Sequence, residues 1–204
     1  MIELYYRPGA ASLVVHATLE EAGAEYRLIR VHGMDPPEFL HLNPLGRVPT
    51  MTFNGMTMTE AAACVMHISD LYPKAQLAPE TGTAERAQWY RWLTFLTNTV
   101  QMSFINYFRP ERAIAEQFTE ALETQAVEVL AGLRDQIESH LRSGGPYLLG
   151  ERFSSADLFL AMLTRWGRNL DPKWWELPQL GAHWQVVRAR PSMQRVYEQE
   201  ELPE

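Results

Sequence analysis

The stretch VPTMTFNGMTM, residues 48–58, decides the fold of the first part of the chain. Two runs of β-forming residues, Val48–Phe53 and Met56–Met58, flank the dipeptide Asn54-Gly55. Both of these turn residues tolerate positive φ, and Asn-Gly between two β runs is the strongest short hairpin signal. The stretch therefore predicts an antiparallel hairpin with a two-residue turn.

Elements on the N-terminal and C-terminal sides of this hairpin complete a small sheet covered by helices. The expected elements are strands over 2–6 and 26–31, helices over 12–22 and 61–71, and one short helical turn within the loop 32–42. Gly23 ends the first helix and Tyr72-Pro73 ends the second, because glycine caps a helix and proline cannot continue it. A strand–helix–strand unit followed by a hairpin predicts a mixed four-stranded sheet.

The character of the chain changes after residues 77–82 (LAPETG), which are rich in turn formers and are typical of a linker. Helical patterns then extend over residues 83–108, 111–142, 154–170 and 178–200, and no strand is expected. The expected organisation is an α/β domain over 1–76, a linker over 77–82 and an all-α domain over 83–204.

Composition excludes several classes of function. The chain of 204 residues is 46% hydrophobic with a net charge of −7, which disfavours nucleic acid and anionic membranes as partners. No signal-peptide pattern opens it, and no stretch approaches the roughly 18 apolar residues that span a bilayer. Cys64 is the only cysteine, and the six histidines lack metal-ligand spacing. We expect a cytoplasmic protein without disulfide or metal.

Motifs along the whole chain carry a resemblance to a known family. They are YYRPGAAS (5–12), NPLGRVP (43–49), TEA (59–61), WLTF (92–95), FRP (108–110) and FSSAD (153–157). In this order and at these separations they resemble the glutathione transferase superfamily, in particular its bacterial beta-class-like members. The resemblance implies a thioredoxin-like N-terminal domain, an all-α C-terminal domain, glutathione as co-substrate and a homodimer.

The resemblance places the backbone of glutathione beside Val48 and Pro49. An extended peptide can bind an exposed backbone segment as an added strand. Periodicity alone favours an ordinary trans bond before Pro49, whereas the resemblance implies a cis bond that turns the Val48 N–H and C=O toward the ligand. Arg47 and His32 are expected to reach the glycyl carboxylate, although such loop residues are more often simply solvated.

Glu60 and Ala61 open the helix that the resemblance assigns to the γ-glutamyl end of glutathione. Free N–H groups at a helix N-terminus can hold a carboxylate, and the Glu60 side chain can pair with the ligand ammonium. Alternatively, Glu60 simply favours a helix N-terminus. Ala61 replaces the serine usual in the family, so that one hydroxyl donor is missing while the backbone N–H remains.

The thiol-activating position departs from the beta class. Ala11, expected beside the thiol, stands where beta-class members have cysteine, so mixed-disulfide chemistry at this position is excluded. Ser12 is the first candidate for stabilising the thiolate, and its hydroxyl has the alternative role of a helix N-cap. Tyr6 is the rival donor, while Tyr5 should lie on the opposite sheet face as a structural residue.

The all-α domain is expected to bind the electrophile. Gln101 and Met102 replace the beta-class histidine and lysine, which is the second departure from that class. Ser154-x-x-Asp157 is a capping-box pattern that should start a largely apolar helix over 155–166. Aromatic walls suit an apolar electrophile, but the same stripe can be core. The candidates are Gln101, Phe104, Phe108, Arg109, Arg165 and Trp166.

The leading hypothesis is a glutathione transferase of detoxification type. It would activate the thiol for attack on a hydrophobic electrophile or an organic hydroperoxide. One alternative is a non-catalytic glutathione-binding or regulatory protein of the same fold, because fold alone does not license activity. Another is a glutathione-dependent isomerase or dehalogenase.

Overall fold

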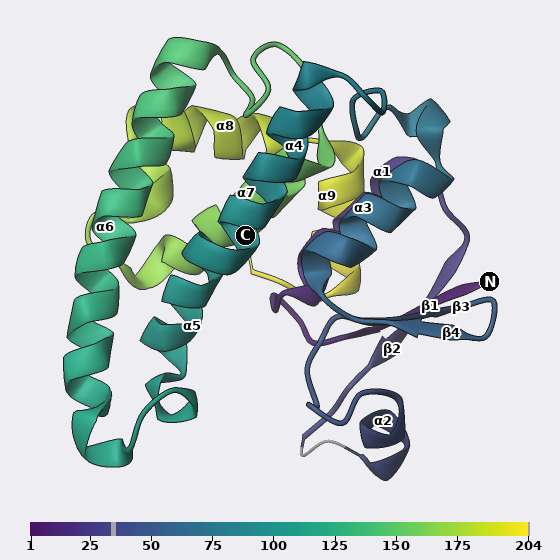
Figure 1. The fold of residues 1–204 in the computed structure, drawn as a ribbon, viewed down its shortest axis with the longest axis horizontal. Helices are drawn as coiled ribbons and strands as arrows, with labels where there is room; N and C mark the ends of the chain where they lie inside the picture. The colour runs from purple at the N-terminus through teal and green to yellow at the C-terminus, as the bar shows by residue number, and fades with distance from the viewer. Residues whose placement is uncertain (34–35, 204) are drawn as a thin grey trace. The chain divides into compact units, whose positions relative to one another are not determined.

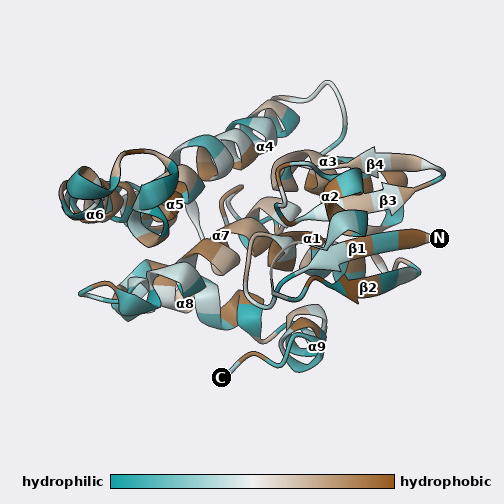
Figure 2. Ribbon diagram, turned by 90° about the horizontal axis from the view of Figure 1, so that it is seen from below, coloured by the Kyte–Doolittle hydropathy of each residue, from teal (hydrophilic) through white to brown (hydrophobic). Residues whose placement is uncertain are grey.

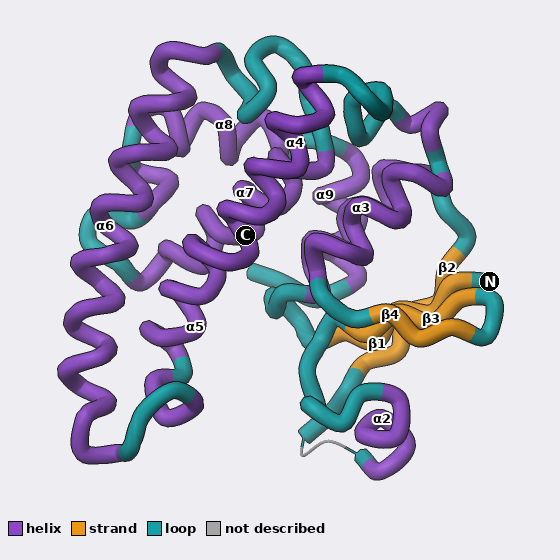
Figure 3. The backbone as a smooth tube through the Cα atoms, viewed as in Figure 1, coloured by secondary structure: helices purple, strands orange, loops and turns teal. Residues whose placement is uncertain are grey.

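The computed structural model describes residues 1–33 and 36–203, which form two compact units. Unit 1 comprises Met1–Pro79 together with Val187–Glu204, and unit 2 comprises Glu80–Val186. All strands of the described chain lie in one sheet of unit 1, and the remainder is helix and loop (Figure 3). Residues 34–35 of the expected loop lie outside the described residues. The C-terminal residues thus group with unit 1, while the expected domain boundaries stay a prediction.

Unit 1 contains the expected mixed four-stranded sheet, in the order β2-β1-β3-β4. Strand β1 (Ile2–Tyr6) pairs in parallel with β2 (Tyr26–Arg30) and antiparallel with β3 (Thr50–Phe53). Strand β3 pairs antiparallel with β4 (Met56–Met58). The sequence prediction of a β-α-β unit followed by a hairpin is therefore confirmed.

The hairpin turn has the geometry that its dipeptide predicts. Asn54 has φ 48° and Gly55 has φ 77°, so both turn residues occupy the left-handed region. Strand β3 begins at Thr50 rather than at Val48, because Pro49 has no N–H to donate to a ladder. Strand β2 likewise ends one residue earlier than expected, at Arg30.

Helices cover both faces of the sheet in unit 1 (Figure 1). Helices α1 (Ser12–Ala22) and α3 (Ala61–Leu71) pack together on one face, and α9 (Pro191–Gln199) packs against α1. The short helix α2 (Pro37–Leu42) lies on the other side. Gly23, with φ 64°, ends α1 as a left-handed cap, as expected from the sequence.

Side chains of β1 alternate between the two faces. Leu4 and Tyr6 are buried toward the helices, and the Tyr6 ring lies 6.3 Å from the ring of His16 in α1. Tyr5 points the other way and stacks on Phe39 of α2 at 5.6 Å. The expectation that the two tyrosines occupy opposite faces is confirmed.

Unit 2 is helical, with one helix crossing its boundary. Its helices are α4 (Ala84–Phe95), a π-helical turn (Leu96–Gln101), α5 (Met102–Phe108), α6 (Thr119–Gly144), α7 (Ser155–Trp166) and α8 (Pro178–Arg188). Short 3-10 turns in unit 2 lie at Pro110–Arg112, Glu116–Phe118, Gly167–Asn169 and Trp174–Glu176. A further 3-10 turn, Pro73–Ala75, follows α3 in unit 1.

Two expected helices differ from the structure. The expected helix over 178–200 is wrong as a single element, because Pro191 lacks the N–H that would continue the ladder and instead starts α9. The expected helix over 111–142 begins only at Thr119, after two 3-10 turns.

Helix α7 is the centre of unit 2. All 12 of its residues are buried, and its ribbon is mostly apolar, whereas α6 alternates between polar and apolar residues (Figure 2). The capping box is confirmed: the Ser154 N–H donates to Asp157 Oδ2 at 2.8 Å. The local pattern therefore starts this helix where the sequence predicts.

Gly167, just after α7, is required by a close approach. A Cβ there would lie 2.8 Å from Trp174 Cβ and closer still to its fully buried ring. We expect Gly167→Ala to lower the free energy of unfolding by about 2 kcal/mol, as overpacking does. Gly132→Ala in α6, where nothing lies within 4 Å, should raise it by about 0.5–1 kcal/mol. Denaturant unfolding measures both, and equal stabilities would contradict the prediction.

Candidate functional site

Strand register brings the loops of unit 1 to one edge of its sheet. Tyr6 pairs with Arg30 in the parallel ladder, Tyr5 with Thr50, and Met51 with Met58. The ends of β1, β2 and β4 and the start of β3 therefore coincide. This edge, called the loop edge below, holds all the residues predicted to bind or activate glutathione: Tyr6, Ala11, Ser12, His32, Arg47, Val48, Pro49, Glu60 and Ala61.

The turn between β1 and α1 is held by its own backbone. The Ala10 N–H donates to the Arg7 carbonyl at 3.1 Å, and the Leu13 N–H donates to the Ala10 carbonyl at 2.9 Å. The helix begins at Ser12, and the capping position is Ala11, which offers no side-chain acceptor. The alternative role of Ser12 as N-cap is therefore wrong, since the helix starts one residue too early for it.

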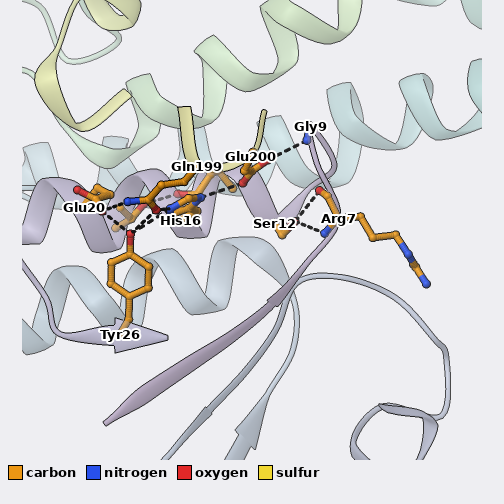
Figure 4. Close-up of polar contacts among 10 residues, drawn as sticks. Arg7, Gly9, Ser12, His16, Glu20, Tyr26, Gln199 and Glu200 are labelled. Atoms are coloured by element: carbon orange, nitrogen blue, oxygen red, sulfur yellow. Dashed lines mark hydrogen bonds and ion pairs between the residues drawn. The ribbon is translucent and has the colours of Figure 1, made fainter. Parts of the chain in front are cut away.

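Ser12 instead fastens the peptide of Arg7 to the start of α1 (Figure 4). Its side chain is fully buried, and its Oγ lies 3.2 Å from the Arg7 N–H nitrogen and 3.3 Å from the Arg7 carbonyl oxygen. The hydroxyl thus accepts one bond and donates another. To donate to a thiolate, its proton must rotate away from the Arg7 carbonyl.

Tyr6 ends β1 beside this turn and faces the helices. Burial raises the pKa of the Tyr6 phenol above its usual value, outweighing the opposing effect of Arg30. The phenol therefore keeps its proton at neutral pH and remains a hydrogen-bond donor.

Asn43 organises the NPLGRVP segment. Its buried amide donates to the Arg47 carbonyl at 2.8 Å and to Thr50 Oγ1 at 3.0 Å, while its Oδ1 accepts the Leu45 N–H at 3.2 Å. One side chain therefore fixes both ends of the turn that precedes β3. Arg47 is exposed at the middle of this turn.

The same segment has the backbone geometry that the resemblance implies. The Val48–Pro49 bond is cis. Arg7 Nη1 donates to the Gly46 carbonyl at 3.2 Å and so ties the β1–α1 turn to this segment. His32, in the loop after β2, is exposed.

Glu60 has an unusual backbone at the start of α3. Its φ of 66° and ψ of 109° lie in a region that L-residues rarely adopt, and its side chain is exposed. Its carbonyl accepts the Cys64 N–H at 3.0 Å, which starts the helix ladder. The first-turn N–H groups, from Ala61 onward, have no partner within the helix. Strain at this kind of position is typical of functional sites.

We expect Glu60→Gly to raise the free energy of unfolding by about 1 kcal/mol and to weaken glutathione binding. Glycine relieves the left-handed strain but removes the carboxylate. Gln76→Gly is the matched control, because Gln76 also has positive φ, 54°, but lies outside the predicted site. Denaturant unfolding and calorimetry should show stabilisation in both variants and weaker binding only in Glu60→Gly. Equal binding by the two variants would refute a ligand role for Glu60.

The lone cysteine does not contribute chemistry at the loop edge. Cys64 is buried in α3, and burial, with the charge of Glu60, raises the pKa of its thiol to about 12. Such a thiol is not a nucleophile at neutral pH. Within residues 1–33 and 36–203, no three His, Cys, Asp or Glu side chains group as a metal site. In the same ranges no helix is both long and apolar enough to cross a bilayer.

The residues predicted to bind an electrophile lie in unit 2 and differ in exposure. Phe104 is fully buried, with its ring 5.9 Å from Phe108, 5.9 Å from Trp166 and 5.0 Å from Trp174. Phe104 and Trp166 therefore belong to the core of unit 2, which is the alternative that the sequence left open for these aromatic residues. Arg165 is buried, Arg109 is exposed, and Gln101 and Phe108 are half-buried.

Gln101 ends the π-helical turn and has an unusual side chain. Its Oε1 atom is buried without a hydrogen-bond partner in the described chain. Isolated π turns occur frequently at functional sites, and a buried unpartnered carbonyl costs free energy. Among the residues predicted to bind the electrophile, Gln101 is therefore the one whose side-chain oxygen lacks a hydrogen-bond donor in the described chain.

Sequence reasoning missed several residues that shape the loop edge. Asn43 was visible only as part of a motif. His16 sits in an otherwise apolar helical face, and Glu200 lies among exposed glutamates, which is typical of solvated residues. Yet Glu200 is buried and accepts the Gly9 N–H at 2.8 Å. No spacing pattern links residues so far apart in the chain.

Comparison with known proteins agrees with these features. The model of "Glutathione S-transferase, N-terminal domain" matches residues 2–70, and that of "Glutathione S-transferase, C-terminal domain" matches residues 57–191. The chain is 26% identical over 199 residues to glutathione S-transferase GstA of Escherichia coli O157:H7, covering 95% of this chain and 96% of that protein.

Solved structures extend the similarity to the fold. A glutathione transferase homologue from Sulfitobacter, with bound glutathione, matches with a TM-score of 0.88 and 31% identity over 99% of both chains. The bacterial beta-class enzyme of Sphingomonas chungbukensis matches with a TM-score of 0.86 and 29% identity over 98% of this chain and 100% of that one. The chain therefore belongs to the glutathione S-transferase family and is similar to its bacterial beta class, but it has alanine at position 11 and a single, buried cysteine.

Proposed function

We propose that this protein binds glutathione at the loop edge of unit 1 and activates its thiol. The thiolate would then attack a hydrophobic electrophile or an organic hydroperoxide. The observation that carries the proposal is the convergence of the β1–α1 turn, the segment before β3 and the start of α3 at one edge of the sheet. Each segment offers a group that suits a different part of glutathione.

Recognition is divided among these segments. The Val48 backbone binds the cysteinyl part as an added strand would. The N-terminus of α3 at Ala61 holds the γ-glutamyl carboxylate, and Glu60 pairs with the ammonium. Arg47 and His32, both exposed, bind the glycyl carboxylate.

The thiolate is stabilised at the start of α1, next to Ala11. The positive end of a helix favours an anion, and a directed donor adds to this effect. Ser12 is the proposed donor. Its oxygen stays fixed by the Arg7 N–H at 3.2 Å, while its bond to the Arg7 carbonyl, at 3.3 Å, is long and easily exchanged. Tyr6, protonated and buried, is the rival.

The electrophile is bound by unit 2. Gln101, with its unpartnered Oε1, and the half-buried Phe108 are the principal contacts. The exposed Arg109 adds a further contact to the electrophile. Three buried residues support these contacts: Phe104, Arg165 and Trp166. The functional assembly is a homodimer, as in the family.

Reduction of a hydroperoxide needs no protein cysteine in this scheme. The thiolate attacks the peroxide and breaks its O–O bond. The products are glutathione sulfenic acid and an alkoxide, and the alkoxide takes up one proton to become an alcohol. A second glutathione displaces water from the sulfenic acid and forms glutathione disulfide. The buried Cys64 takes no part.

The test is a titration of the thiolate ultraviolet absorbance of bound glutathione in wild type, Ser12→Ala and Tyr6→Phe. A free thiol has a pKa of about 8.5, and we expect a clearly lower pKa for the bound thiol in wild type. Loss of this lowering in Ser12→Ala alone identifies Ser12 as donor, and loss in Tyr6→Phe alone identifies Tyr6. An unshifted wild-type pKa would reject thiol activation.

A second candidate function is glutathione binding without catalysis. The observation that favours it is that Ala11 and Ala61 carry no polar group, where related proteins have cysteine and serine. The single cysteine of the chain, Cys64, is buried. Turnover measured with aryl halides, organic hydroperoxides and maleyl-type acids separates the two candidates. Tight glutathione binding with no turnover on any of them would favour the non-catalytic protein.

A further inference from the structure

A buried carboxylate from the C-terminal segment reaches the turn before α1 (Figure 4). Glu200 is 1% exposed and directly follows α9. Its Oε2 accepts the Gly9 N–H at 2.8 Å, and its Oε1 lies 2.9 Å from His16 Nδ1. One side chain therefore connects the turn, α1 and the C-terminal segment.

His16 is held on both sides of its ring. Its Nε2 lies 2.8 Å from Gln199 Oε1 and 3.0 Å from the Tyr26 hydroxyl, which itself donates to Glu20. Its Nδ1 faces Glu200 Oε1, and a carboxylate oxygen accepts a hydrogen bond. The imidazole therefore fixes the carboxylate of Glu200 in one orientation, with its second oxygen directed at Gly9.

Hydrophobic packing does not explain this arrangement. Burying a carboxylate costs free energy unless hydrogen bonds compensate, and apolar residues of similar volume commonly stabilise as much or more. His16 is fully buried on α1, and its neighbours in the chain, Val15 and Ala17, are buried and apolar. A buried polar network of this kind contributes a specified geometry.

The geometry that it specifies is that of the β1–α1 turn. Gly9 has φ 66°, so the chain reverses there in a conformation that favours glycine. Ala10 bonds back to Arg7, and Ser12 lies only three residues beyond Gly9. Because Glu200 holds the Gly9 peptide from outside the turn, it sets where this turn lies relative to the start of α1.

We propose that Glu200 is a positioning residue for thiol activation, acting through the N–H of Gly9. The inference rests on the proposed function, since it assumes that glutathione sulfur binds beside this turn. It assigns to the C-terminal segment a task in unit 1: keeping the turn in the conformation that presents the helix N-terminus and Ser12 to the thiol. His16 acts one step further away, by orienting Glu200.

Two conservative substitutions separate positioning from charge. Glu200→Gln keeps the length and one acceptor oxygen for Gly9 but removes the charge. Glu200→Asp keeps the charge but is one methylene shorter, so it cannot contact both Gly9 and His16. Glu201→Ala is the neighbouring control, because Glu201 is exposed and pairs with Arg30 at the surface.

We expect Glu200→Asp to raise the pKa of bound glutathione thiol by about 1 and to lower kcat/KM about tenfold, mainly through kcat, because small displacements of reacting groups are costly. Glu200→Gln and Glu201→Ala should remain within about threefold of wild type. The amide proton signal of Gly9 in a ¹H–¹⁵N spectrum should move in Glu200→Asp and stay near its wild-type position in Glu201→Ala. Circular dichroism confirms that each variant is folded.

The outcomes distinguish this inference from the function on which it rests. An activated thiol in wild type that is unchanged in Glu200→Asp, or a loss in Glu200→Gln with retention in Glu200→Asp, would overturn positioning while leaving the proposed function intact. An unlowered thiol pKa in wild type would reject the proposed function and thiol positioning together. In that case a shifted Gly9 amide in Glu200→Asp still identifies the contact as structural only.

Discussion

Replacing Asp157 by alanine is expected to lower the free energy of unfolding by about 3–5 kcal/mol. Asp157 lies in the first turn of α7, and its carboxylate is fully buried. It accepts the Ser154 and Leu148 N–H groups, each at 2.8 Å, and lies 3.2 Å from His183 Nε2. Alanine would leave these donors buried without partners, and each costs about 1–3 kcal/mol.

Two control variants distinguish the effect of removing this buried helix cap from the effect of removing an exposed carboxylate. Asp157→Asn keeps the shape and one acceptor oxygen, so we expect a smaller loss than for alanine. Asp135→Ala on α6 removes an exposed surface partner of Arg134 and should change stability by less than about 0.5 kcal/mol. Denaturant unfolding monitored by tryptophan fluorescence compares the three. A loss below about 1 kcal/mol in Asp157→Ala would show that the cap is dispensable.

Asn43→Ala is expected to weaken glutathione binding at least about tenfold and to cost about 2 kcal/mol of stability. The Asn43 amide is the common anchor of the Leu45 N–H, the Arg47 carbonyl and Thr50 Oγ1. Alanine leaves the turn without this anchor. The Val48 backbone, which we propose as the strand-like contact of glutathione, then loses its fixed position.

The comparison with aspartate makes this prediction specific. Asn43→Asp keeps the acceptor for Leu45 but replaces the amide donor by an oxygen facing the Arg47 carbonyl, so we expect it to bind glutathione as poorly as alanine does. Asn169→Ala, at an exposed asparagine in unit 2, should change neither quantity. Calorimetric titration with glutathione measures the effect. Unimpaired binding by Asn43→Asp would mean that the amide donor is unnecessary.

Short-range patterns predicted most of the elements because their causes are local. Asn54-Gly55 needs only its own φ preferences to close the hairpin, and Ser154 and Asp157 cap α7 across a single turn. The break before α9 was also local, since Pro191 ends any helix that reaches it. The expected single helix there overlooked this signal, although nothing beyond the sequence was needed to find it.

The loop edge was predicted through motifs, and its organisation was not. Motifs in the sequence predict Val48, Glu60 and Ser12 as site residues, and the strand register explains why these three residues share one edge of the sheet. The sequence could not predict which side chains are exposed. It left open whether the aromatic residues of the all-α domain form core or contact the electrophile, and only the burial of Phe104 assigned this residue to the core. Whether a side chain is buried depends on what packs over it from elsewhere in the chain.

The sequence by itself determined the mixed sheet, the hairpin, the capped central helix and the family resemblance, because propensities and spacings act over a few residues. Only the tertiary structure decided how the turn before α1 is held. The bond from Gly9 to Glu200 joins residues 191 positions apart. No periodicity records such a pair, and burial alone distinguishes Glu200 from the exposed glutamates beside it.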